Sequence, residues 1–100
     1  MFDFDLVEGF EWDAGNARKS AEKHDVSQAE AEQVFFNTPL LMAGDARHSV
    51  AEARFHALGK ADTDRRLHIT FTLRAAGTMI RVISARDMSR KERFVYEQEA

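Results

Sequence analysis

Cysteine is absent from this 100-residue chain, and proline occurs only once. Without cysteine the protein has no disulfide, no thiolate nucleophile and no cysteine-based zinc site, which suits a reducing cytosol. The sequence also lacks a run of about 18 apolar residues, the length that a membrane-spanning helix needs. Its first residues are acidic, where a secretory signal is basic. We therefore expect a cytoplasmic protein that does not enter a membrane.

Two kinds of catalytic arrangement are missing as well. There is no glycine-rich phosphate loop, and neither Ser49 nor Ser84 has the context of a serine nucleophile. The four histidines, at positions 24, 48, 56 and 68, do not have the spacing of metal ligands. We expect neither a metal site nor a cofactor.

The composition is that of one folded domain spanning residues 1–100. Hydrophobic residues make up 44% and charged residues 31% of the chain, which are ordinary values for a globular protein. The net charge of −3 conceals two unlike halves, because residues 51–100 carry ten Lys and Arg against seven Asp and Glu. The excess is sharpest from Arg74 to Arg93. A local basic surface can bind phosphate whatever the total charge, although arginine is also common on surfaces that bind nothing.

Two helices are expected in the first half of the chain. Asp13 is a typical N-cap, and the first helix should run from there to about Lys23 or His24. Ser27 and Glu30 have the spacing of a capping box that starts a second helix. Pro39 prevents its continuation.

Strands are expected in the second half. Residues 54–59 favour a strand, and in residues 67–73 every second residue is apolar, so those residues should share one face. Residues 75–77 indicate a hairpin turn, after which residues 78–86 form a third strand with Ile80, Val82 and Ser84 on one face. Ser89 and Glu92 form another capping box, which begins a last helix. The sequence therefore predicts an α+β fold with two N-terminal helices, an antiparallel sheet meander and a C-terminal helix.

The side chains left for chemistry are Arg, Lys, His, Glu and a single Tyr. This set suits metal-free cleavage of RNA, in which a 2′-hydroxyl attacks its own phosphate and guanidinium groups stabilise the added charge. Arg81 interrupts an apolar strand and must find an anion, which is either a phosphate or a structural carboxylate such as Glu52. Arg54 has the same two interpretations. Arg86 precedes the last helix, where a phosphate could meet it and the helix N-terminus together.

Other candidates also have structural interpretations. Tyr96 suits either catalysis or the core, and Trp12 favours a core anchor over a platform for stacking bases. His68 lies on the polar side of its strand, so we expect it to be solvated. His24 closes a helix, where a cation complements the helix dipole.

Several short motifs occur together and in a characteristic order. The motifs are Phe10-Glu-Trp-Asp13, Lys23-His24-x-Val26-Ser27, Val34-Phe35-Phe36, His48-Ser49-x-x-Glu52-x-Arg54-Phe55, Leu58-Gly59, Arg81-x-Ile83-Ser84-Ala85-Arg86 and Lys91-Glu92-Arg93-x-x-Tyr96-Glu97. In this combination they resemble BrnT toxins of type II toxin–antitoxin systems. Departures fall at Asp25, Asn16, Ser20 and Gln28, where such toxins usually have Gly, Lys, Asn and Phe.

The resemblance implies a RelE-like ribonuclease that inhibits translation. It also implies neutralisation by a BrnA-type antitoxin with a ribbon-helix-helix domain, and repression of the operator DNA through that complex. As a site we expect Arg54, Arg81 and Arg86 on the scissile phosphate. The candidates for proton transfer are Tyr96, Lys91, His48 and Glu52. The alternative is a non-catalytic module of the same fold that binds RNA or protein.

Overall fold

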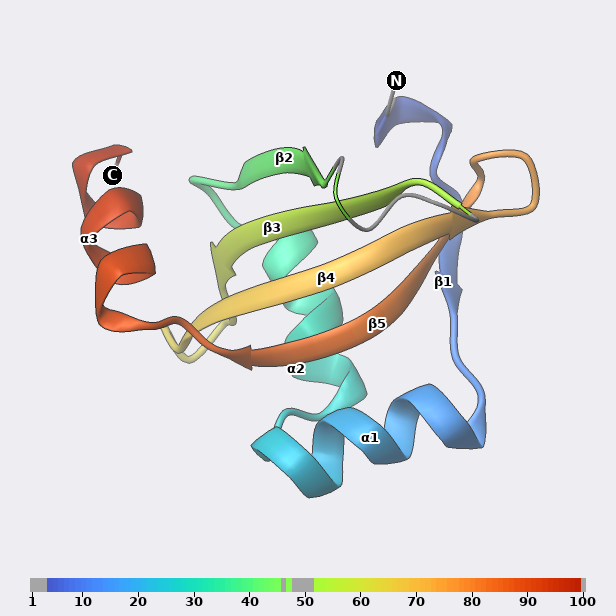
Figure 1. Ribbon diagram of the computed structural model, residues 1–100, viewed down its shortest axis with the longest axis horizontal. Helices are drawn as coiled ribbons and strands as arrows, with labels where there is room; N and C mark the ends of the chain where they lie inside the picture. Colours follow the sequence, from blue (N-terminus) through green and yellow to red (C-terminus); the bar gives the residue numbers. More distant parts are fainter. Residues whose placement is uncertain (1–3, 46, 48–51, 100) are drawn as a thin grey trace.

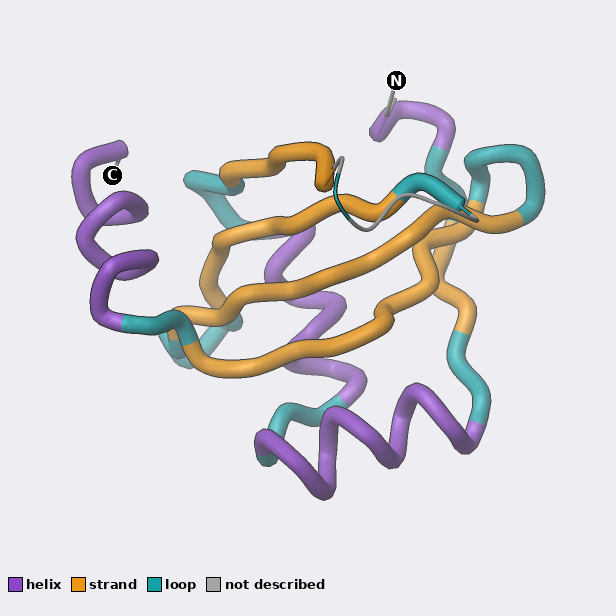
Figure 2. The backbone as a smooth tube through the Cα atoms, viewed as in Figure 1, coloured by secondary structure: helices purple, strands orange, loops and turns teal. Residues whose placement is uncertain are grey.

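The computed structural model describes residues 4–45, 47 and 52–99, which form an α+β domain around one five-stranded sheet. Helix α2 crosses one face of the sheet, α1 lies along the β5 edge, and α3 lies beyond one end of the strands (Figure 1). Short 3-10 helices precede β1 and follow α2 (Figure 2). The elements are η1 (Phe4–Leu6), β1 (Gly9–Glu11), α1 (Ala14–His24), α2 (Gln28–Gln33), η2 (Val34–Phe36), β2 (Leu41–Asp45), β3 (Arg54–Lys60), β4 (Arg66–Arg74), β5 (Met79–Asp87) and α3 (Arg90–Glu99).

The strands lie in the order β1-β5-β4-β3-β2. Strands β3 to β5 form the expected antiparallel meander and β2 extends it, but β1 pairs with β5 in parallel, so the sheet is mixed. The sequence did not predict β2. This strand lies at the sheet edge, and its sequence Leu-Met-Ala-Gly-Asp has no apolar alternation that would announce it.

The capping signals proved reliable. The Asp13 carboxylate accepts a hydrogen bond from the amide of Asn16 (3.0 Å), and α1 ends at His24 as predicted. Asp25 follows with a φ of 55°, the left-handed conformation in which a helix commonly ends. Both hydrogen bonds of the Ser27–Glu30 capping box are present. These local contacts set the corner between α1 and α2.

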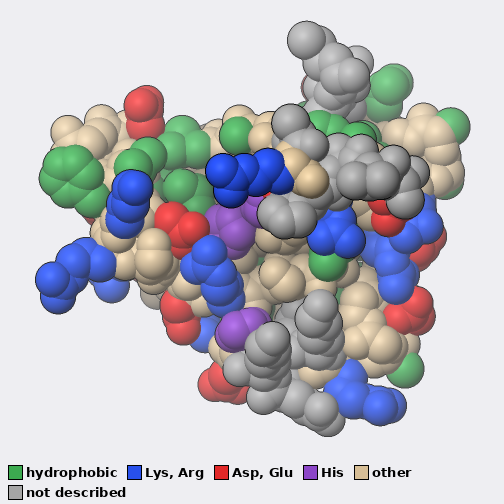
Figure 3. All heavy atoms as spheres, viewed as in Figure 1, with side chains coloured by type: hydrophobic (Ala, Val, Ile, Leu, Met, Phe, Trp, Pro, Cys, Tyr) green, Lys and Arg blue, Asp and Glu red, His purple; other side chains and the backbone are tan. Residues whose placement is uncertain are grey.

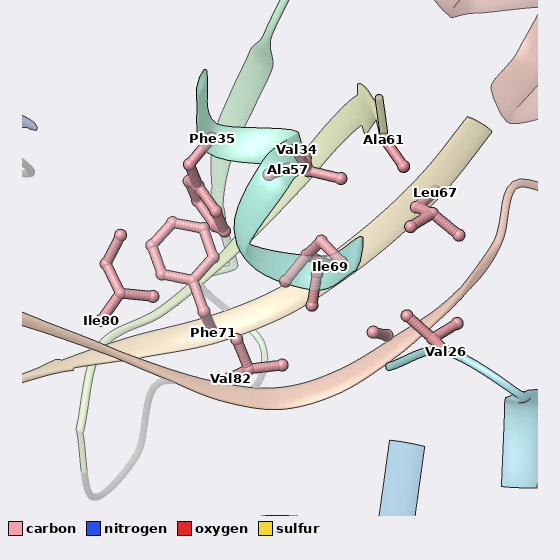
Figure 4. Packing of buried hydrophobic residues seen from close by; sticks show 12 residues of the cluster. Val26, Val34, Phe35, Ala57, Ala61, Leu67, Ile69, Phe71, Ile80 and Val82 are labelled. Atoms are coloured by element: carbon pink, nitrogen blue, oxygen red, sulfur yellow. The ribbon is translucent and has the colours of Figure 1, made fainter. Parts of the chain in front are cut away.

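The hydrophobic core lies between the sheet and the segment formed by α2 and η2. Phe35 from η2 meets Phe71 from β4 edge to face, with ring centroids 5.2 Å apart (Figure 4). Trp12 packs against this core, and its indole Nε1 donates to Glu32 Oε2 (2.7 Å). The interpretation of Trp12 as a core anchor is therefore confirmed. Full burial of a side chain such as Phe71 contributes about 1.5–3 kcal/mol.

A β-bulge in β5 corrects the expected faces of that strand. Val82 pairs with Phe71 and Ser84 pairs with Thr70, so Ile83 is an extra residue without a partner on β4. The alternation reverses there, and Ala85 joins the core in the place predicted for Ser84. The carbonyl of Val82 accepts a hydrogen bond from Asn16 Nδ2 (3.0 Å), which ties α1 to the bulge.

Candidate functional site

The face of the sheet turned away from α2, which we call the open face, carries three rows of side chains across the strands. Residues paired on neighbouring strands point to the same side, so the register fixes each row. Lys and Arg side chains surround a patch of histidine on this face (Figure 3). The first row is Asp45, Arg54, Thr72, Arg81 and Glu11, the second is Ala43, His56, Thr70 and Ser84, and the third is Leu41, Leu58, His68 and Arg86.

Arg81 is held in the first row by two carboxylates. Its Nη1 lies 3.0 Å from Glu11 Oε1 and its Nη2 lies 2.9 Å from Asp13 Oδ2. The hydrogen bond with Asp13 is the main cause that raises the pKa of Arg81. A structural carboxylate was one of the two expected partners, but Glu52 was the wrong choice. Glu52 instead pairs with Arg74 (3.3 Å).

Arg54 belongs to the same row, two strands away from Arg81. With strands about 4.8 Å apart, their backbones are separated by roughly 10 Å, a gap that two extended guanidinium side chains can span together. Between them Thr72 is 1% exposed and donates to the carbonyl of Ala53 (2.6 Å). The first row therefore offers two cations on one side of a rigid sheet.

Arg86 ends the third row and is bound by Glu92 of α3. Its Nη1 and Nη2 donate to Oε1 and Oε2 of Glu92 at 2.8 and 2.9 Å. The pairing with Arg86 lowers the pKa of Glu92 to about 2, and the Ser89 amide adds a hydrogen bond to the same carboxylate. The carboxylate thus lies between Arg86 and the N-terminus of α3, the place that the sequence indicated for a phosphate.

Two histidines that the sequence analysis did not select fill the middle of the open face. His56 Nε2 lies 2.7 Å from Asp45 Oδ2 and its Nδ1 lies 3.1 Å from Thr70 Oγ1, so both ring nitrogens are engaged. The rings of His56 and His68 stack with centroids 4.9 Å apart and planes 25° from parallel. His56 is therefore oriented on both sides and supports the ring of His68.

His68 is buried, and the prediction that it is solvated was wrong. It is 8% exposed, because β4 is the central strand and the stacked ring of His56 covers one side of the imidazole. Its Nδ1 has no hydrogen-bond partner among the described residues. Burial, and then the nearby charge of Arg86, lower the pKa of His68 to about 4. At neutral pH it is an uncharged imidazole beside a guanidinium.

A hollow of about 320 Å³ adjoins these histidines. It lies between β2, the ends of β3 and β4, and α3. Most of its walls are apolar, and its polar side chains are the two histidines and Glu92. The lining residues are Leu41, Met42, Ala43, His56, Leu58, His68, Glu92 and Val95.

The candidates for proton transfer do not gather on the open face. Tyr96 is 1% exposed and its hydroxyl donates to the carbonyl of Pro39 (2.6 Å), which matches its interpretation as a core residue. Lys91 is exposed on α3. Glu52 is engaged with Arg74, as described above. His48 lies outside the described residues.

A sequence signal for the histidine pair did exist. Strands β3 and β4 form a hairpin symmetric about Thr63, so that Leu58 faces His68 and His56 faces Thr70. A hairpin whose turn is centred on the polar loop at residues 62–64 has this pairing, which places both histidines on one face of the sheet. This pairing does not show their burial, since that depends on α3 and on the other strands.

The fold and this face define a small α+β domain with three arginines and a histidine pair on one exposed sheet surface. A family model described as the ribonuclease toxin BrnT of type II toxin–antitoxin systems matches residues 12–92. The chain therefore belongs to this family, which confirms the resemblance seen in the sequence. Type II systems pair such a toxin with an antitoxin protein. A comparison with curated proteins gave no match. Among the described residues, no helix is long and apolar enough to cross a membrane.

Proposed function

We propose that the chain cleaves RNA on the open face without a metal ion, through attack of a ribose 2′-hydroxyl on the adjacent phosphate. The observation that carries this proposal is the presence of Arg54, Arg81 and Arg86 on one face, with an uncharged, buried histidine, His68, beside Arg86. Guanidinium groups suit this reaction, because they bind phosphate and stabilise the charge that develops on it.

The three arginines divide between two positions along the strands. Arg54 and Arg81 share the first row, and Arg86 ends the third, four paired positions further along β4. At about 3.3 Å per residue this separates the two groups by roughly 13 Å at the backbone. Side chains reaching inward from both ends suit an RNA strand lying across the second row, with phosphates bound at either end.

The reaction also requires two proton transfers. As the 2′-oxygen bonds to phosphorus, its proton leaves to a base, and the bond to the 5′-oxygen breaks as that oxygen gains a proton. The products are a 2′,3′-cyclic phosphate and a 5′-hydroxyl. His68 suits the role of base by its position, because it lines the hollow and lies beside Arg86, the cation that would bind the phosphate. Tyr96, Lys91, His48 and Glu52 remain the other candidates for proton transfer.

Membership of the family extends the proposal to partners. The fold is proposed to be RelE-like, and cleavage to inhibit translation in the cytoplasm. The antitoxin is proposed to be of the BrnA type, with a ribbon-helix-helix domain through which the complex binds operator DNA. Separate evidence for these points will come from isolating the toxin with its partner.

The test is cleavage of a short labelled RNA by the purified chain in the presence of a chelator. We expect a 2′,3′-cyclic phosphate product, and a loss of rate of at least about 100-fold in Arg54→Ala, Arg81→Ala and Arg86→Ala. Arg93→Ala is the matched control, because Arg93 is an exposed α3 cation that belongs to none of the three rows.

Three results would contradict the proposal. Wild-type rates in both Arg81→Ala and Arg86→Ala would show that the site is elsewhere. Loss of RNA cleavage in the presence of the chelator would show that the reaction needs a metal ion. RNA binding without any product, in the wild-type protein, would favour the non-catalytic module.

A further inference from the structure

The hollow beside the histidine pair is well suited to a flat, largely apolar ligand. Five of its eight lining residues are apolar, and they come from β2, β3 and α3. His56 and His68 present stacked imidazole rings, and imidazole is one of the side chains on which unpaired bases stack. A hollow of about 320 Å³ is large enough to admit a single ring system while leaving it open to solvent at one side.

Its position relative to the cations identifies the ligand further. His68 and Glu92 line the hollow, and Glu92 holds Arg86 through both carboxylate oxygens. A ligand whose apolar group enters the hollow can therefore reach Arg86 with an attached anionic group. A nucleotide has this arrangement, because its base is apolar on both faces and its phosphate is anionic.

The geometry points to the hollow as a binding site for the nucleobase on the 5′ side of the cleaved bond. This inference rests on the proposed function, since the nucleotide on that side carries the attacking 2′-hydroxyl, which would then lie at His68. The buried Nδ1 of His68 has no hydrogen-bond partner among the described residues, and it lies at the edge of the hollow.

The chemistry of the walls also predicts how bases are distinguished. Both ring nitrogens of His56 are engaged, and the Glu92 carboxylate is occupied by Arg86 and the Ser89 amide. Few polar groups remain to read the hydrogen-bonding edge of a base. Selection should therefore follow stacking area, which favours purines over pyrimidines.

The experiment uses DNA strands that contain one ribonucleotide, so that cleavage is possible at one position only. The base at that position is varied among purines, pyrimidines and an abasic riboside. We expect purines to be cleaved fastest and the abasic strand at least about tenfold more slowly, as is typical for loss of one stacked base. Binding of the same strands with a 2′-O-methyl group, which cannot be cleaved, should follow the same order.

Ala43→Phe fills the hollow from an exposed position on β2, and it should abolish the difference between base-bearing and abasic strands. Gly44→Phe is the matched control, because its side chain leaves the same strand on the opposite face, where an added Cβ meets no atom within 4 Å. The control should keep the base preference.

The possible failures are distinguishable. Equal cleavage of base-bearing and abasic strands, unchanged in Ala43→Phe, would overturn the base site while leaving the ribonuclease intact; the hollow would then serve another ligand, such as a protein side chain. If no strand is cleaved but binding still depends on the base and on Ala43, the catalytic proposal fails and the base site stands.

Discussion

Both guanidinium nitrogens at the tip of Arg86 are bound by the two carboxylate oxygens of Glu92, at 2.8 and 2.9 Å. The pair joins the end of β5 to the first turn of α3. A phosphate that binds Arg86 must therefore share this cation with Glu92 or displace the carboxylate. In the free protein, Glu92 therefore positions Arg86 and neutralises its charge before RNA binds.

Glu92→Gln is expected to separate the positioning of Arg86 from the neutralisation of its charge. A glutamine at this position can still accept the hydrogen bond from the Ser89 amide, so the helix cap is kept while the charge is removed. We expect stronger RNA binding, because an anion near the phosphate is gone, and a loss of about 1 kcal/mol in the free energy of unfolding. RNA titration and denaturant unfolding measure the two quantities. Weaker RNA binding in this variant would show that Arg86 needs the Glu92 carboxylate in order to bind RNA.

Acid should destabilise the protein in a window set by His68. Because its pKa is about 4 when folded and 6.5 ordinarily, the unfolded chain takes up this proton first as the pH falls. The stability due to neutral His68 is complete above pH 6.5, decreases towards pH 4 and is lost below it, by up to about 3 kcal/mol. Denaturant unfolding between pH 7 and pH 4 should show a clearly shallower decline in His68→Leu.

Glu92 supplies the control for this titration. Its pKa is lowered from 4.5 to about 2, so its stabilisation is present above pH 4.5 and is lost as the pH falls towards 2. Glu92→Gln should remove this lower window, and because the Glu92 charge raises the pKa of His68, the His68 window should move to lower pH without disappearing. Identical pH profiles for wild type and His68→Leu above pH 4.5 would mean that His68 is not kept neutral by the fold.

Close packing between β3 and η2 predicts that Gly59 cannot be replaced by alanine without cost. A Cβ at residue 59 would lie 2.7 Å from Cγ1 of Val34 and 3.2 Å from its carbonyl oxygen, and neither group can move easily. We expect Gly59→Ala to lower the free energy of unfolding by about 1–3 kcal/mol. Gly44→Ala, where nothing lies within 4 Å, should change it by less than about 0.5 kcal/mol. Equal melting temperatures for the two variants would contradict this packing.

Tyr96→Phe distinguishes a structural from a catalytic tyrosine. Its hydroxyl donates to the carbonyl of Pro39, which links α3 to the segment before β2. We expect a loss of about 1 kcal/mol in stability and an unchanged rate of RNA cleavage below the melting temperature. A fall of 100-fold or more in rate, with the fold intact by circular dichroism, would instead make Tyr96 a proton donor or acceptor.

The elements that sequence reasoning identified correctly are those specified by residues close together in the chain. Capping boxes at Ser27 and Ser89 require contacts only three residues apart, and both formed as predicted. The alternation of residues 67–73 correctly assigned Leu67, Ile69 and Phe71 to the core. Arg81 was also correctly placed on the face of β5 opposite Ile80 and Val82, whereas the role of the three arginines stays a prediction.

The site was predicted less completely than the fold. No local sequence pattern predicts the bulge at Ile83, which places Ala85 in the core instead of Ser84. The partners of Arg81 are Glu11 and Asp13, about 70 residues away along the chain, so no spacing rule could select them. No spacing rule could predict the burial of His68 either, because it occupies a polar position in the alternation of residues 67–73, and such a position suggested exposure.

By itself the sequence determined where the helices start, the hairpins that join β3, β4 and β5, the α+β class and the family, since each depends on short-range geometry or on motif order. Only the tertiary structure decided which charges meet and which polar groups are buried. Arg65 illustrates the difference, because its guanidinium joins the carbonyls of His24 and Asp25 to the carboxylates of Glu30 and Asp87. Such contacts form once packing has brought distant segments together, and their energies depend on burial that no single segment possesses.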